Sequence, residues 1–310
     1  MCSTALAIET KKLYKTYGSR KAVDGLSLHV PRGCVYGFIG PNGAGKSTTM
    51  KMLLGLVRPT SGMVQLLGQT LTRENRIQLL SHTGSLIESP SGYAHLTGQE
   101  NLAILADLKG VPRSEIDRVL EVVQLTPDRS RKVGGYSLGM KQRLGIAMAL
   151  LGSPELLILD EPTNGLDPAG IQEMRALIAS LPERTGATVL LSSHLLGEME
   201  QMATQVGILD HGRLLFEGPL EQLQQHSRGG CRLRTLWPER AFPVLESRGL
   251  PARLDQEGRL ELPFLPEEAL ADLVQALAEA GAGVVELQPC TRTLEEIFLS
   301  LTGAENGGIQ

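Results

Sequence analysis

The residues with the clearest chemical purpose lie in the stretch 40–48, which reads Gly-Pro-Asn-Gly-Ala-Gly-Lys-Ser-Thr. In such a loop successive backbone N–H groups can point at phosphate oxygens, and a following helix start adds partial positive charge. We expect Lys46 to reach the β- and γ-phosphates of a nucleotide and the Ser47 hydroxyl to bind Mg²⁺. The nucleotide-binding residues expected here are Gly40, Asn42, Gly43, Gly45, Lys46, Ser47 and Thr48.

Two adjacent carboxylates, Asp160 and Glu161, follow the apolar run 156–159. At the end of a buried strand, Asp160 is expected to hold Mg²⁺, and Glu161 to orient the water that attacks a γ-phosphate. Without a phosphate loop upstream, a solvated acidic turn capped by Pro162 would be the preferred interpretation. His194 also follows an apolar run, and its imidazole can donate a hydrogen bond to the γ-phosphate, although alone it would be an ordinary loop residue. Lys46, Glu161 and His194 are therefore the expected catalytic set.

Strands and helices that alternate along the chain must position these residues. The loop at 40–48 lies between an apolar strand at 34–39 and a helix that follows at 49–54. The runs 156–159, 187–191 and 206–209 read as strands, with helices at about 168–180 and 195–203 between them. Helical periodicity over 97–124 and 137–151 indicates a helical insertion. This alternation predicts an α/β fold with a mostly parallel sheet.

The two ends of the chain show other patterns. Alternating residues with turn signals at 5–17 and 22–30 predict an antiparallel β subdomain. Beyond 231, strands at 232–237, 259–264 and 284–287, with helices at 267–280 and from 293 to before 303, predict a small α+β domain. The predicted organisation is a nucleotide-binding domain (1–224), a linker (225–230), an accessory domain (231–303) and a flexible tail (304–310).

Composition limits the partners. The chain has 310 residues, 42% of them hydrophobic, and a formal net charge of -4. Its basic clusters are no longer than dipeptides, so nucleic-acid binding is not expected. Its four cysteines are widely spaced, which favours reduced thiols in the cytosol. No secretory signal is visible, and no run approaches the roughly 18 to 20 apolar residues of a membrane-spanning helix. Any membrane role is expected to come through a partner.

In order and spacing, these motifs resemble the ATP-binding cassette (ABC) family over about residues 5–224. The loop at 40–48 resembles its Walker A motif, 156–161 its Walker B motif, 165–168 its D-loop and 193–194 its switch histidine. The segment 136–143, Tyr-Ser-Leu-Gly-Met-Lys-Gln-Arg, occupies the place of the family signature. The resemblance implies a P-loop NTPase fold that uses ATP and Mg²⁺. It also implies a head-to-tail dimer in which the signature of one copy contacts the ATP of the other.

The resemblance assigns further residues. Ser137 and Gly139 of the signature are expected to contact the partner's nucleotide, because a helix start can cap an anion. Tyr17 is expected to stack on adenine; Tyr14 is close in sequence, and a packed edge aromatic is the alternative. Leu138 and Met140 depart from the usual signature, which places the dimer contact in question. Glu88 stands where the family has a glutamine; it can engage Mg²⁺ or its water but cannot donate as an amide does.

The single cassette, the absence of a spanning helix and the helical insertion predict the ATP-hydrolysing subunit of an ABC exporter that powers a separate membrane permease. This subunit would lie in the cytoplasm on the inner face of the membrane. Segments at 88–102 and 136–145 resemble the bacitracin and lantibiotic self-protection branch, and the tail at 293–299 resembles drug-exporter ATPases. The alternative is a soluble ABC ATPase that acts on ribosomes or DNA. The single cassette, the lack of a long heptad run and the low basicity disfavour it, and a non-hydrolysing module is disfavoured by the complete catalytic set.

Overall fold

A computed structural model describes residues 5–88, 92–226, 228–255 and 257–291. The chain divides into two compact units, Met1–Leu220 and Glu221–Gln310, and each is described by itself. The expected final helix from 293, the tail at 304–310 and residues 89–91 lie outside the described residues.

A six-stranded sheet in the order β11-β10-β4-β9-β8-β7 forms the centre of the first unit. Its strands are β4 (Val35–Ile39), β7 (Thr83–Leu86), β8 (Leu156–Leu159), β9 (Thr188–Ser193), β10 (Gln205–Asp210) and β11 (Arg213–Pro219). All neighbouring pairs are parallel except β10 with β11. The continuous apolar runs predict this arrangement, because a parallel sheet is covered on both faces. The edge strand β11 was not predicted.

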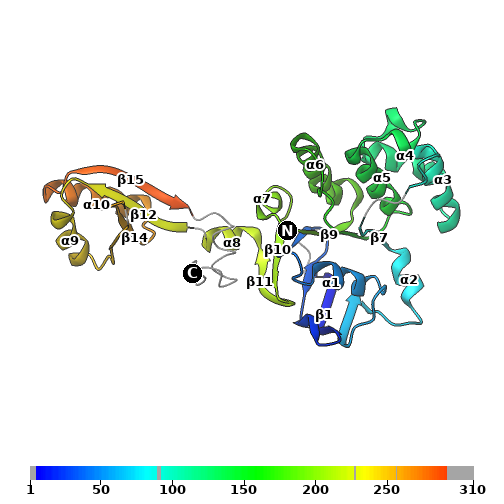
Figure 1. Ribbon diagram of the computed structural model, residues 1–310, viewed down its shortest axis with the longest axis horizontal. Coiled ribbons are helices and arrows are strands. Elements are labelled where there is room, and N and C mark those ends of the chain that lie inside the picture. Colours follow the sequence, from blue (N-terminus) through cyan, green and yellow to red (C-terminus); the bar gives the residue numbers. More distant parts are fainter. Residues whose placement is uncertain (1–4, 89–91, 227, 256, 292–310) are drawn as a thin grey trace. The chain divides into compact units, whose positions relative to one another are not determined.

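A second, antiparallel sheet packs against the first through a shared core. Its order is β2-β1-β5-β6, with β3 also paired to β1. Its strands are β1 (Leu6–Tyr17), β2 (Arg20–Leu26), β3 (His29–Pro31), β5 (Ser61–Leu66) and β6 (Gln69–Thr70). One apolar cluster contains the fully buried side chains of Ile8 on β1, Phe38 on β4 and Met50 on α1 (Lys46–Leu53). Helix α1 is therefore held by both sheets (Figure 1).

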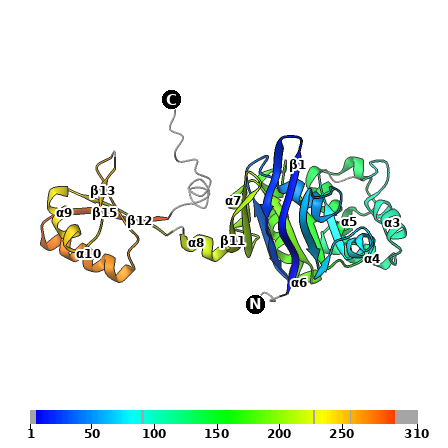
Figure 2. The same ribbon diagram turned by 90° about the horizontal axis from the view of Figure 1, so that it is seen from below.

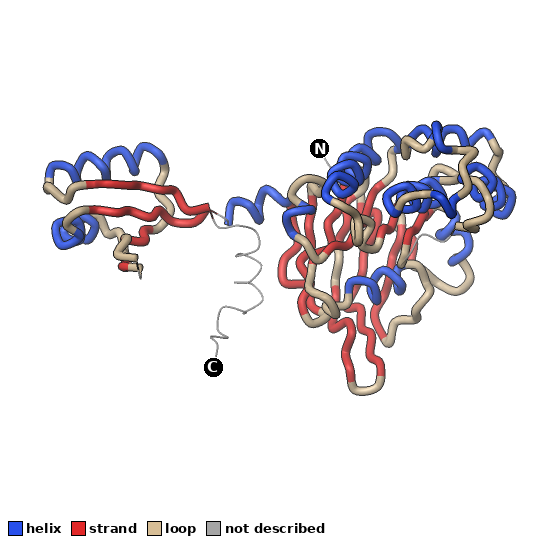
Figure 3. Tube along the Cα trace, turned by 45° about the horizontal axis from the view of Figure 1, so that its top comes forward, coloured by secondary structure: helices blue, strands red, loops and turns tan. Residues whose placement is uncertain are grey.

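The helical insertion lies to one side of the strands in every view (Figures 2 and 3). The helices of the first unit after α1 are α2 (Arg76–Ser81), α3 (Gly98–Lys109), α4 (Ser114–Val122), α5 (Leu138–Leu150), α6 (Pro168–Thr185) and α7 (Leu196–Met199). Thr97 begins α3 with a capping box to Glu100. Gly84 lets the backbone of α5 approach β7, since a Cβ there would overlap the Ala149 carbonyl oxygen. Helix α7 is shorter than the helix predicted at 195–203, and α6 extends beyond the helix predicted at 168–180.

In the described part of the second unit, four strands form an antiparallel sheet in the order β13-β14-β12-β15. Its elements are α8 (Leu220–His226, at the boundary), β12 (Arg228–Thr235), α9 (Pro238–Ser247), β13 (Arg253–Leu254), β14 (Leu260–Leu262), α10 (Glu267–Glu279) and β15 (Val284–Thr291). From β12 onward the order βαββαβ is that of a split βαβ, or ferredoxin-like, fold. Helix α9 was not predicted, and the segment 225–230, predicted as a linker, contributes to α8 and β12.

A row of leucines crosses this small sheet in register. Leu254, Leu260, Leu233 and Leu287 lie side by side on adjacent strands. Leu233 and Leu260 are fully buried and belong to a cluster with Leu245 of α9 and Leu277 of α10. The second unit therefore has its own hydrophobic core, as an independent domain requires.

Candidate functional site

The phosphate loop joins the end of β4 to the start of α1. Gly45 has a φ of 107° and stands at the N-cap of α1, where a Cβ would overlap the Ala22 carbonyl oxygen, so the conformation and the space both require glycine. Lys46 follows with its side chain only 6% exposed. Its Nζ donates to the Gly40 carbonyl oxygen at 2.6 Å. The loop therefore holds its lysine at the N-terminus of a helix, the geometry that suits phosphate binding.

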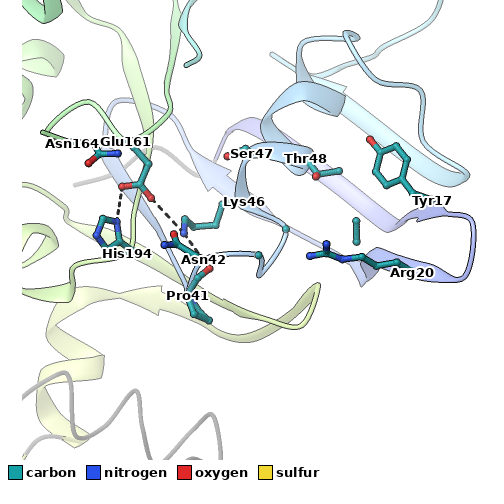
Figure 4. A pocket seen from close by; sticks show the side chains of 13 residues that line it. Tyr17, Arg20, Pro41, Asn42, Lys46, Ser47, Thr48, Glu161, Asn164 and His194 are labelled. Carbon is teal, nitrogen blue, oxygen red and sulfur yellow. Dashed lines mark hydrogen bonds and ion pairs between the residues drawn. The ribbon is translucent and has the colours of Figure 1, made fainter. Parts of the chain in front are cut away.

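A cavity of about 620 Å³ opens over this loop (Figure 4). Its lining residues are Tyr17, Arg20, Ala22, Pro41, Asn42, Gly43, Gly45, Lys46, Ser47, Thr48, Glu161, Asn164 and His194. Tyr17 is half exposed, with the Lys15 ammonium 4.7 Å from its ring centroid. The hydroxyl of Tyr14 instead lies near Gly25. Of the two candidate tyrosines, Tyr17 is the one that lines the cavity; Arg20 and Asn164 carried no sequence signal that singled them out.

The catalytic candidates come from the carboxyl ends of adjacent parallel strands. Ile39 pairs with Ser193 and Leu159 with Leu191, so β4, β9 and β8 end at the same edge of the sheet. Beyond these ends, Glu161 Oε2 lies 2.9 Å from His194 Nδ1, and Glu161 Oε1 lies 3.4 Å from Lys46 Nζ (Figure 4). The structure thus brings together the three residues predicted as catalytic.

Ser192 contacts both acidic residues that follow β8. Its hydroxyl donates to Asp160 Oδ1 at 2.6 Å and accepts the Glu161 backbone N–H at 2.9 Å. Glu161 itself has a φ of 49°, in the left-handed region that costs a non-glycine residue free energy. The hydrogen bond from Ser192 helps to hold this strained turn. The strand predicted at 187–191 ends before Ser192, and nothing in the spacing of Ser192 indicates a partner in the segment after β8.

Glu88, the remaining residue predicted to bind Mg²⁺, forms an ion pair with a lysine. It follows β7 and pairs through Oε1 with Lys51 Nζ of α1 at 2.7 Å, with 71% of its side chain exposed. The hydrogen bond with Lys51 lowers the pKa of the Glu88 carboxyl, and the same bond raises the pKa of Lys51. Only Oε1 makes this contact, and Glu88 lines a cavity of about 420 Å³ together with Asp160, the predicted Mg²⁺ ligand.

The signature residues line a different cavity. Ser137 is the N-cap of α5 and accepts the Met140 N–H at 3.2 Å. Ser137 and Gly139 line a cavity of about 710 Å³ together with Gly165 and Asp167. Leu138 closes part of this wall, with its Cδ2 near Gly165. Ser137 and Gly139 therefore do not line the cavity that holds Lys46, whereas Leu138 and Lys141 line a third cavity of about 420 Å³ with Glu161.

The oxygen donors present are of the kind that Mg²⁺ prefers. Asp160, 7% exposed, and the hydroxyl of Ser47 at the start of α1 are the candidates. Within the described residues, no group of three or more His, Cys, Asp or Glu side chains is placed to hold a metal. Proteins commonly bind Mg²⁺ through one or two carboxylates together with substrate phosphates, and Asp160 and Ser47 offer ligands of this kind.

Across the described ranges, no helix has both the length and the apolar character needed to cross a bilayer.

Comparison with known proteins identifies the class. The family described as ABC transporter matches residues 23–164. The bacitracin transport ATP-binding protein BcrA of Bacillus licheniformis is 42% identical, covering 96% of this chain and 97% of that protein. The lantibiotic transport ATP-binding protein SrtF of Streptococcus pyogenes is 45% identical over 68% of this chain and 90% of that protein.

A solved structure, described as a dimeric post-hydrolysis state of an ATP-binding cassette with ADP and phosphate, has a TM-score of 0.61. Its sequence identity is 25%, and the match covers 69% of this chain and 98% of that chain. The predicted cassette fold is therefore confirmed. Near full-length similarity to BcrA places the chain in the ABC transporter ATP-binding family, and the protein is an ATPase whose hydrolysis of ATP is coupled to transport.

Proposed function

We propose that this chain is the ATP-hydrolysing subunit of an ABC exporter and powers a separate membrane permease that exports antibiotic or peptide-like compounds. The observation that carries the proposal is the position of Glu161, which contacts both Lys46 and His194 beside the phosphate loop. The proposal about the exported compound rests on the relatives that transport bacitracin and lantibiotics.

In this mechanism the cavity over the phosphate loop receives ATP. Tyr17 stacks on adenine, because an exposed aromatic ring at the rim offers a face to any planar base. Backbone N–H groups from Gly43 to Thr48 and the Lys46 ammonium bind the phosphates. This arrangement stabilises negative charge as it develops, which is the main contribution that a protein can make to phosphoryl transfer.

Glu161 is placed to act on the attacking water. Once phosphate oxygens engage Lys46, one carboxylate oxygen of Glu161 becomes available to accept a hydrogen bond from water, while the other stays with His194. His194 then steadies Glu161 through Nδ1, and its other ring nitrogen can face the γ-phosphate. Asp160 and Ser47, with Glu88 as an outer candidate, would hold Mg²⁺, which supplies charge neutralisation between the β- and γ-phosphates.

The complete site needs a second copy of the chain. Ser137 and Gly139 line a cavity other than the one that holds Lys46, so one chain does not cap its own nucleotide. A head-to-tail dimer would bring the Ser137 segment of each copy to the ATP of the other. The related cassette described as dimeric after hydrolysis supports this assembly.

The permease would keep the chain at the inner face of the membrane. The second unit, with its own core, would be an accessory domain of the same subunit. The alternative, an ABC ATPase acting on ribosomes or DNA, is not favoured, because the relatives named above are transport proteins.

The decisive experiment is Glu161→Gln in the full chain. This change keeps the side-chain size but removes the carboxylate, so ATP turnover should fall by at least 100-fold while ATP binding is kept. ATP-dependent dimers should also accumulate in light scattering. Lys46→Ala is the contrasting variant and should lose tight ATP binding. Parental turnover by Glu161→Gln would overturn the role given to Glu161.

Transport is tested in cells that express the chain together with a candidate permease. The pair should raise the bacitracin concentration that stops growth, and the Glu161→Gln chain should not. Equal protection by both chains would overturn the exporter proposal.

A further inference from the structure

A buried carboxylate that none of the motifs includes lies behind the catalytic residues. Glu198 is in α7, four residues after His194, and only 2% of it is exposed. Its Oε2 accepts hydrogen bonds from Thr163 Oγ1 at 2.7 Å and Ser193 Oγ at 3.1 Å. Its Oε1 lies 3.7 Å from Arg175 Nη2 of α6. Four separate segments of the first unit therefore meet at this one side chain.

Stability alone is a poor explanation for this group. Removing a charge from water is costly, and apolar residues of similar volume often serve as well. The pairing is also incomplete, since Arg175 Nε is buried with no hydrogen-bond partner among the residues that the structure describes. A buried network that is only partly satisfied adds a further cost. The arrangement is better explained by what it positions.

The two hydroxyl donors lie beside the catalytic pair. Thr163 comes two residues after Glu161, and Ser193 comes immediately before His194. By accepting from both, Glu198 ties the turn that carries Glu161 to the strand end that carries His194. Movement of either segment would lengthen the 2.9 Å contact between Glu161 and His194.

The opposite face of β9 carries a matching connection. Side chains alternate across a strand, so Ser192 and Ser193 point to opposite faces. Ser192 bonds Asp160 and the backbone of Glu161, whereas Ser193 bonds Glu198. The end of β9 is thus joined to the segment after β8 on both faces, and the left-handed turn at Glu161 lies between the two connections.

We infer that Glu198 is a positioning residue for ATP hydrolysis, holding Glu161 and His194 in register through Thr163 and Ser193. The inference rests on the proposed roles of Glu161 and His194. Glu198 touches neither ATP nor the attacking water, so its removal should slow turnover and leave nucleotide affinity unchanged.

The test compares four variants of the full chain, Thr163→Val, Ser193→Ala, Glu198→Gln and Glu198→Ala. We would measure kcat and KM for ATP hydrolysis, the Kd of a fluorescent ATP analogue and the Tm. Thr163→Val keeps the side-chain shape but removes the donor, and should lower kcat about tenfold with KM and Kd within twofold of the parent. Glu198→Ala should lower kcat further.

Conservative replacement separates positioning from packing. The amide oxygen of Glu198→Gln can still accept from both hydroxyls, so its kcat should stay within about threefold of the parent. Ser180→Ala is the matched control, because the Ser180 hydroxyl bonds only the Leu177 carbonyl oxygen of its own helix in the contacts described. It should change neither kcat nor KM.

Parental kcat in Thr163→Val and Glu198→Ala, with only a lower Tm, would overturn the inference. A loss of ATP affinity with kcat unchanged would overturn it as well. If Glu198→Ala does not fold, Thr163→Val still decides. Failure of the proposed function would be recognised by a different result, namely parental ATP hydrolysis by the Glu161→Gln variant.

Discussion

Glu161 and His194 are 33 positions apart in the chain, yet the Oε2 atom of Glu161 lies 2.9 Å from the Nδ1 atom of His194. The contact exists because β8 and β9 are parallel neighbours whose carboxyl ends coincide. The position of Glu161, the residue proposed to orient water, therefore also depends on a second strand, β9. Chemistry at this edge therefore depends on how well the two strand ends keep their register.

Mixing two inactive variants tests the composite site. Lys46→Ala removes the phosphate-binding lysine, and Ser137→Ala removes the signature hydroxyl, so each alone should have less than about a tenth of parental turnover. In a head-to-tail dimer of one Lys46→Ala chain with one Ser137→Ala chain, one site keeps both Lys46 and Ser137. Turnover should therefore recover on mixing, to at most half the parental value in each mixed dimer.

The control for that experiment is a mixture of Lys46→Ala with Glu161→Gln, which both damage the Walker side. Each mixed dimer then lacks an intact site, and turnover should stay low. Equal, low turnover in both mixtures would show that Lys46 and Ser137 do not act across a dimer.

Replacing Tyr17 tests the stacking contact. Tyr17→Ala should weaken binding of a fluorescent ATP analogue by about 5- to 150-fold, because an aromatic face under a base contributes about 1–3 kcal/mol. Tyr17→Phe keeps the ring and should bind as the parent does. Tyr14→Ala provides a comparison with the nearby tyrosine, and a larger loss there than in Tyr17→Ala would transfer the role to Tyr14.

Replacing Glu88 and replacing Lys51 should have opposite effects on the Mg²⁺ concentration that turnover requires. Glu88→Gln removes a carboxylate and should raise the Mg²⁺ concentration for half-maximal turnover. Lys51→Met frees Glu88 from its 2.7 Å partner and removes a positive charge, so that concentration should fall. Each shift should be only a few-fold, because water and salt screen an exposed ion pair. Unchanged titrations in both variants would remove Glu88 from the metal candidates.

The Asp24–Arg213 contact predicts a pH-dependent contribution to stability. Asp24 Oδ2 accepts from Arg213 Nη2 at 2.8 Å, which connects β2 to β11. This hydrogen bond lowers the pKa of the Asp24 carboxyl below its usual 3.8. The lowered pKa means that the contribution is complete above the unfolded-state pKa and is lost as pH falls through the folded-state pKa. Asp24→Asn should therefore have a lower Tm at pH 7.

The difference in Tm between Asp24→Asn and the parent should then begin to shrink near pH 4, where the unfolded-state carboxyl is protonated, and continue to shrink as pH falls through the lower folded-state pKa. Thermal melts by circular dichroism at several pH values would follow it. A difference that is constant from neutral to acid pH would contradict the ionic origin.

Local pattern was sufficient for much of the fold. Glycine spacing and an apolar run placed the phosphate loop between β4 and α1, and continuous apolar residues indicated the buried strand β8. These signals are local because backbone conformation and burial on both faces impose them residue by residue. Two helices were predicted less well. Helix α7 has only four residues, fewer than predicted, and helix α9, which contains Pro243, was not predicted.

What the sequence determined by itself was the chemical set, namely Lys46, Asp160, Glu161 and His194, because each follows a strand or loop with a recognisable pattern. Only the tertiary structure decided which side chains meet. Strand order brought Glu161 to His194, pairing across the sheet gave Ser192 its bond to Asp160, and Lys51 became the partner of Glu88. Burial of Glu198 against Thr163 and Ser193 was also decided there, since contacts between distant segments depend on packing that no local periodicity encodes.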